Sequence, residues 1–83
     1  MPTLLIRDGF KFFFYVNDHE PMHIHVMKGG DFAKIDLTTL QVVRNEMKSN
    51  ELKRALSIVK KEKTNFIRKW HEYFRQRRIG ENG

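Results

Sequence analysis

This chain of 83 residues contains no cysteine, so no disulfide framework stabilises it. Any metal site must therefore use histidine, aspartate and glutamate side chains. Long hydrophobic runs are also absent: the longest, Phe12–Val16, is far shorter than the roughly 20 residues of a membrane-spanning helix. The N-terminal residues 1–4 lack the basic region of a secretory signal. These absences predict a soluble, cytoplasmic protein that does not enter a membrane.

Acidic residues are scarce relative to basic ones, and the imbalance is confined to the second half of the chain. Residues 1–43 carry four Lys and Arg against five Asp and Glu, whereas residues 44–83 carry twelve against five. Such a positive field attracts the phosphates of RNA or DNA, or an acidic protein, although a solvated helix face has the same composition. The residues expected to contact nucleic acid are Lys53, Arg54, Lys60, Lys61, Arg68, Lys69, Arg75, Arg77 and Arg78.

The first half of the chain is rich in β-branched and aromatic residues, which favour strands. Asp8-Gly9 lies between two apolar segments and is typical of a two-residue hairpin turn. Gly29-Gly30 marks a second hairpin. These signals predict an antiparallel meander with strands at residues 3–7, 10–16, 23–27, 32–37 and, more briefly, 40–43.

The second half lacks proline and glycine from residue 50 to residue 79, and its apolar residues follow a different period. From Leu52 to Phe74 they recur at spacings of three, four and seven, which places them on one face of an α-helix. Ser49 and Glu51 supply an N-cap and a first-turn acid. We therefore expect one helix over residues 49–78, rather than two helices with a break near residues 62–65.

A sheet followed by a helix predicts an α+β fold, with the helix packed across one face of four or five strands. The sheet is expected over residues 1–43, within a single domain over residues 1–79. Residues 80–83 are expected to fray. A domain of this size buries roughly 60% of the surface of its unfolded chain, so its core is small.

Three of the four histidines fall between residues 19 and 25, and they define the candidate site. If residues 23–27 form a strand, its period of two places His23 and His25 on one face. His19, His23 and His25 would then offer three nitrogen ligands to a divalent metal ion such as zinc, with Asp18 or Glu20 as a further ligand or a supporting partner. This metal site is one of four interpretations that the sequence leaves open.

The other three interpretations need no cofactor. His23 and His25, with His19 and Asp18, have the side chains for acid–base cleavage of RNA without metal. The cluster can instead bind an anion or nucleic acid without catalysis, with outward-facing aromatic residues of the strand at residues 10–16 stacking on bases. Finally, hydrogen bonds between imidazole and carboxylate can simply hold the loop in place.

The whole pattern resembles a bacterial family catalogued as domain of unknown function 4160. The resemblance is carried by Asn17, Asp18, His19, Pro21, His23, His25, Gly29, Gly30, Ala33, Ile35, Asp36, Arg54, Ala55, Leu56 and Trp70. The family commonly has Pro-Pro-His-Phe-His-Ala where this chain has Pro-Met-His-Ile-His-Val at residues 21–26. The histidines are therefore kept while the turn before them changes.

The resemblance implies one half of a two-gene cassette of the toxin–antitoxin kind. Its partner would then be a small cognate protein encoded nearby, with RNA or a second copy of the chain as alternatives. The expected function is that of a small cytosolic bacterial protein that engages RNA or such a partner. No activity or cofactor follows from the family.

Overall fold

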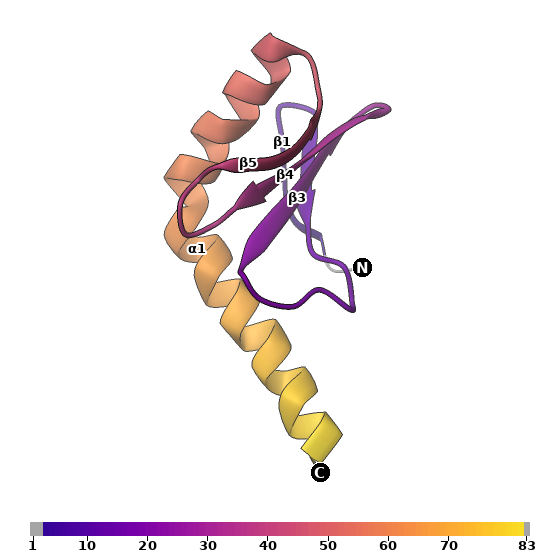
Figure 1. Cartoon of the computed structure of the whole chain (residues 1–83), viewed down its shortest axis with the longest axis vertical. Helices are drawn as coiled ribbons and strands as arrows, with labels where there is room; N and C mark the ends of the chain where they lie inside the picture. The colour runs from indigo at the N-terminus through magenta and orange to yellow at the C-terminus, as the bar shows by residue number, and fades with distance from the viewer. Residues whose placement is uncertain (1–2, 83) are drawn as a thin grey trace.

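The computed structural model describes residues 3–82, with side chains described as far as residue 74. The chain forms five strands and then one helix (Figure 1). Their bounds are β1 Thr3–Arg7, β2 Phe10–Phe13, β3 His23–Lys28, β4 Asp31–Asp36, β5 Val42–Glu46 and α1 Ser49–Asn82.

The strands form one antiparallel sheet in the order in which they occur along the chain. Asp8 and Gly9 join β1 to β2 with φ angles of 54° and 82°, and two successive positive φ angles are what a type I′ hairpin turn requires. Gly29, with a φ of 59°, begins the turn between β3 and β4. Both predicted hairpins are therefore present.

The helix covers one face of the sheet and continues past its edge (Figure 1). Phe12 of β2 pairs with Val26 of β3, and both are fully buried on this face. The ring of Phe12 lies 5.6 Å from that of Phe66 in α1, and Phe14 meets Trp70 edge to face at 5.1 Å. The aromatic strand and the apolar stripe of the helix therefore form the core between the two layers.

The predicted α+β fold is confirmed, with five strands of the four or five expected, followed by one helix. The helix begins at Ser49 as expected, and Glu51 accepts a hydrogen bond from the backbone N–H of Lys48 at 3.1 Å. The helix continues past residue 78 to Asn82. No helix in the described part of the chain is both long enough and apolar enough to cross a bilayer.

β3 and β4 differ from their predicted ranges by one residue at one or both ends, and β2 and β5 differ by more. β2 ends at Phe13 instead of continuing to residue 16, because Tyr15 bonds to Asp18 in a turn rather than to a neighbouring strand. β5 begins at Val42 instead of residue 40 and extends the sheet to Glu46. Here the backbone groups of Leu40 and Gln41 bond to Asp36, which closes the turn between β4 and β5.

Candidate metal centre

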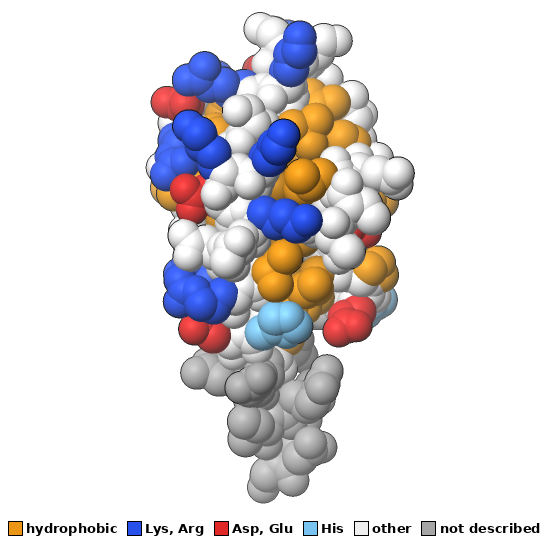
Figure 2. Space-filling view, turned by 90° about the vertical axis from the view of Figure 1, so that its left-hand side faces the viewer, with side chains coloured by type: hydrophobic (Ala, Val, Ile, Leu, Met, Phe, Trp, Pro, Cys, Tyr) orange, Lys and Arg blue, Asp and Glu red, His pale blue; other side chains and the backbone are white. Residues whose placement is uncertain are grey.

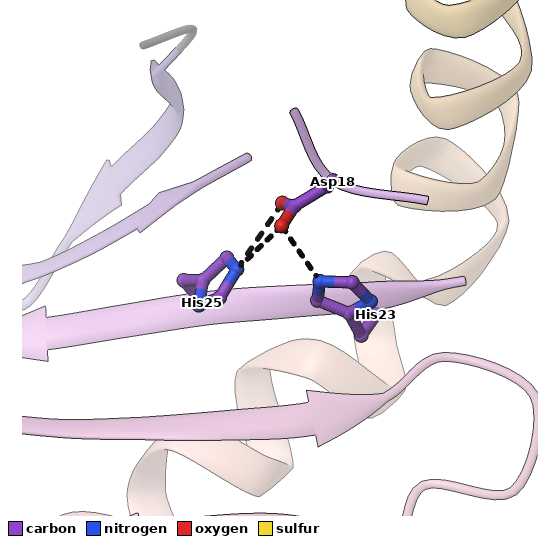
Figure 3. Close-up of side chains that lie close together, drawn as sticks. All are labelled: Asp18, His23 and His25. Atoms are coloured by element: carbon purple, nitrogen blue, oxygen red, sulfur yellow. Dashed lines mark hydrogen bonds and ion pairs between the residues drawn. The ribbon is translucent and has the colours of Figure 1, made fainter. Parts of the chain in front are cut away.

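Strand β3 and the turn before it bring Asp18, His23 and His25 together (Figure 3). The two histidines alternate with Ile24 along β3, so both project to the face of the strand opposite Ile24. Asp18 is fixed by its own backbone turn: its N–H donates to the Tyr15 carbonyl at 3.2 Å, and its Oδ2 accepts the Tyr15 N–H at 2.8 Å. The carboxylate is thereby held over the two imidazoles.

The distances within the group are short. His25 Nε2 lies 3.1 Å from Asp18 Oδ2 and 3.3 Å from Oδ1, and His23 Nε2 lies 3.1 Å from Oδ1. The three ligand atoms all lie within 4.8 Å of one another. Exposed fractions are 12% for the Asp18 side chain, 8% for His23 and 14% for His25, so the group is largely shielded from solvent.

The two ring nitrogens of His23 have different environments. Nδ1 lies 2.8 Å from the Pro21 carbonyl oxygen, which only accepts, so Nδ1 must carry a proton and donate it. Nε2 is buried and has no hydrogen-bond partner among the described residues, although Asp18 Oδ1 is at ion-pair distance. In the neutral ring, Nε2 therefore presents a lone pair to a carboxylate oxygen, and these two acceptors need a proton or a cation between them.

The electrostatics of the group favour a neutral His25 beside an ionised Asp18. Burial lowers the pKa of His25, and the charges of His23 and Lys34 act in the same direction against the opposing effect of Asp18. Burial alone would raise the pKa of Asp18, but the Tyr15 N–H and the two imidazoles outweigh it and lower that pKa. A neutral imidazole and an ionised carboxylate are the forms that bind metal ions.

Both rings are held by aromatic neighbours. His25 stacks on Phe13 with centroids 5.5 Å apart and an interplanar angle of 19°, and the Tyr15 ring meets it edge to face at 4.5 Å. His23 meets Trp70 of α1 at 5.3 Å. The sheet and the helix thus both fix the orientation of the candidate ligands.

The structure separates His19 from the other two histidines of the predicted set. His19 is exposed, and its Nδ1 lies 3.2 Å from the carbonyl oxygen of Glu20. The Glu20 side chain is likewise exposed. The third member of the group is therefore Asp18, one residue before the predicted His19. The period of two along β3 predicted the pair of histidines, whereas the choice of Asp18 depends on the Tyr15–Asp18 turn.

The basic residues expected to contact nucleic acid lie on α1, and Figure 2 shows Lys and Arg side chains along this side of the molecule beside a strip of hydrophobic ones. Arg54 binds Asp8 at 2.8 Å, and Arg68 lies 3.6 Å from Glu72, so both have acidic partners. Lys53, Lys60 and Lys61 are exposed, Lys69 is half-buried, and the side chains of Arg75, Arg77 and Arg78 lie outside the described residues.

The geometry of the Asp18–His23–His25 group suits a metal ion. Ligands at 2.0–2.1 Å from a tetrahedral zinc ion are roughly 3.3 Å apart, close to the 3.1 Å and 3.3 Å that separate Asp18 Oδ1 from His23 Nε2 and His25 Nε2. A histidine that binds a metal usually donates its other ring N–H to a carbonyl or carboxylate, as His23 does to Pro21. Two nitrogens and one carboxylate are the donor set of many zinc and non-haem iron sites.

Comparison with known proteins identifies a family. Neither the curated proteins nor the solved structures contain a significant match. The family described as domain of unknown function (DUF4160) matches residues 9–71, which include β2 to β5, the Asp18–His23–His25 group and most of the helix that packs on the sheet. The chain therefore belongs to the DUF4160 family.

Proposed function

We propose that this protein is a small metal-binding domain in which Asp18, His23 and His25 hold a divalent transition-metal ion. The observation that carries the proposal is the His23 ring. Its Nδ1 is committed to the Pro21 carbonyl, and its buried Nε2 lies 3.1 Å from Asp18 Oδ1 without the geometry of a hydrogen bond. A cation bound between Nε2 and the carboxylate would relieve the repulsion between two acceptors that are shielded from water.

The donor set favours zinc or iron(II) over calcium or magnesium, because imidazole nitrogens are poor ligands for those harder ions. Three protein ligands leave at least one coordination position open, as in catalytic metal sites. A metal bound there would supply a Lewis acid or an activated water. The residues of the chain would orient it: the Tyr15 turn holds Asp18, and the Pro21 carbonyl holds His23.

The test is the metal content of the untagged protein, followed by titration of metal-free protein with zinc, cobalt(II) and iron(II). One equivalent should bind, and His23→Ala should abolish binding. His19→Ala and His71→Ala are matched controls that remove exposed histidines and should leave binding intact. Failure of the folded wild-type protein to bind any of the three metals at micromolar concentration would refute the proposal.

A second candidate function, metal-free cleavage of RNA by a toxin–antitoxin-like protein, is supported by the same three side chains. Burial favours neutral His25, which suits a general base, and Asp18 lies close to both rings. Of the strand aromatics expected to stack on bases, Phe12 and Phe14 are fully buried, whereas Tyr15 is 43% exposed. Tyr15 is thus the one of these three that is placed for stacking.

Three experiments test this second function. RNA cleavage that persists in a chelator and disappears in His25→Ala would support it, and co-expression with the adjacent reading frame would test the cassette. If RNA binds through Lys53, Lys60 and Lys61, its affinity should fall as the salt concentration rises. Each phosphate contact should steepen the slope of log affinity against log salt concentration by roughly 0.7–0.9. Binding that is absent or insensitive to salt would leave these lysines as solvated surface.

A further inference from the structure

We infer that the Asp18–His23–His25 centre receives a phosphate-bearing ligand on the helix-free face of the sheet, with Lys34 as the cation that pairs with the phosphate. This inference rests on the proposed metal site, because the metal would bind the first phosphate oxygen. The ligand is either a small phosphate ester or the backbone of a single-stranded nucleic acid. These two sources share the chemistry that the site would recognise.

The register of the sheet places Lys34 beside the centre. Phe13, His25, Lys34 and Arg44 are successive Cα partners across β2, β3, β4 and β5. Directly paired residues of antiparallel strands project to the same face, and neighbouring strands lie about 4.8 Å apart. The candidate ligand His25 on β3 is therefore followed by Lys34 on β4 and Arg44 on β5, on the same face of the sheet.

This row lies on the face of the sheet opposite the one that packs under α1, although His23, at the start of β3, still contacts Trp70 of the helix. Phe12 and Val26, which alternate with Phe13 and His25, are the residues that pack under α1. Beside the row, Tyr15 and Met27 remain 43% and 37% exposed. The His25 side chain is 14% exposed and Lys34 is half-buried, so a ligand can reach Lys34 and the exposed edge of the His25 ring without displacing the residues that pack under α1.

The charges along the row favour an anion. A divalent metal with ionised Asp18 and two neutral imidazoles has a net charge of +1, and Lys34 raises the local charge to +2. Arg44 adds little, because Glu46 neutralises it at 2.9 Å. Asp36, opposite His23 in the register, turns its Oδ1 to the N–H groups of Thr38 and Thr39. A phosphate can contact a metal and an ammonium group simultaneously through different oxygens.

The experiment uses cobalt(II)-loaded protein, because the visible absorption of cobalt(II) changes when a new ligand enters its coordination sphere. Inorganic phosphate and a short single-stranded oligoribonucleotide are titrated separately into wild type, Lys34→Gln and Lys48→Gln. Lys48 is an exposed lysine just before α1, so its substitution makes the same charge change away from the row. Lys34→Gln should weaken binding by about tenfold, and Lys48→Gln should leave it unchanged.

The outcomes separate this inference from the proposed function. If cobalt(II) does not bind, the metal site itself fails and the inference fails with it. If cobalt(II) binds but neither probe changes its spectrum, or if Lys34→Gln and Lys48→Gln behave alike, the inference alone is overturned. Tighter binding of phosphate identifies a small ester as the source, and tighter binding of the oligoribonucleotide identifies a nucleic-acid backbone.

Discussion

At the scale of single residues, the candidate site depends on which nitrogen of His23 carries a proton. The Pro21 carbonyl fixes that proton on Nδ1, and burial between β3 and Trp70 keeps water from solvating Nε2. His25 differs, because its Nε2 lies within hydrogen-bond distance of Asp18. Metal binding through His25 Nε2 would therefore require the proton of the neutral ring to move to Nδ1, whereas neutral His23 already has the tautomer of a ligand.

Asp18→Asn is the substitution that separates charge from shape at this site. An asparagine side chain retains an oxygen that can accept the Tyr15 N–H, so the turn should persist and the melting temperature of the metal-free protein should change little. The loss of the anionic ligand should lower metal affinity by about 100-fold or more. Competition with a chromophoric chelator measures the affinity, and an unchanged value would exclude Asp18 as a ligand.

Asp36 provides a pH-dependent contribution to stability outside the site. Its Oδ1 accepts the N–H groups of Thr39 and Thr38, and these hydrogen bonds lower its pKa from the usual value of 3.8. A pKa lowered by folding means that the stabilisation is fully present above 3.8 and is lost as the pH falls through the folded-state pKa.

Asp36→Ala should therefore lower the free energy of unfolding at pH 7, by at most about 1 kcal/mol for hydrogen bonds at so exposed a turn. Urea denaturation of wild type and variant at pH 7 and near pH 3 measures the difference. The gap between the two proteins should narrow at the lower pH. A gap that stays constant would show that ionisation of Asp36 contributes nothing.

At the scale of elements, α1 and β3 meet at the candidate site where Trp70 packs on His23. The Trp70 ring, 3% exposed, lies 5.3 Å from the His23 ring and also packs on Phe14 and Phe74. The helix thus buries the ring whose Nε2 is the central candidate ligand. Trp70, which the sequence places on the apolar face of the helix, therefore affects a site formed by Asp18 and by the histidines of β3.

Trp70 is the only tryptophan of the chain, so its fluorescence reports on this contact. Binding of cobalt(II) or nickel(II) beside His23 should quench that fluorescence, because both ions absorb or exchange energy with a nearby indole. His23→Ala should abolish the quenching, whereas His19→Ala should not. Equal quenching in both variants would place the metal elsewhere on the protein.

The strands and the helix could be predicted from local sequence patterns, but the residues that form the site could be predicted only in part. Hydrophobic period and hairpin glycines predicted the meander and the single helix, because both features act over a few residues. The convergence of His23 and His25 likewise followed from the period of two in β3. The choice of Asp18 over His19 was not predictable, since it depends on how Tyr15 leaves the sheet and turns back through Asp18.

At the scale of the whole molecule, one sheet face and one helix form a small core, and the charge lies on two separate surfaces. The exposed lysines of α1 lie on the helix layer, whereas Lys34 and Arg44 lie on the opposite face of the sheet. Only the second surface adjoins the candidate metal centre. RNA binding by the lysines of α1 and phosphate binding by Lys34 can therefore be tested independently, by substitutions on opposite layers.

A domain with so small a core should gain measurable stability from a bound metal. Ligation to the folded state alone stabilises it by about 2.7 kcal/mol at a free metal concentration of 100 times the Kd. For a chain of this length that corresponds to a rise in melting temperature on the order of 10–20 °C. Thermal denaturation with and without zinc measures the rise, which should disappear in His23→Ala and persist in His19→Ala. A rise of equal size in both variants would mean that zinc binds exposed histidines, and no rise in the folded wild type would contradict the metal site.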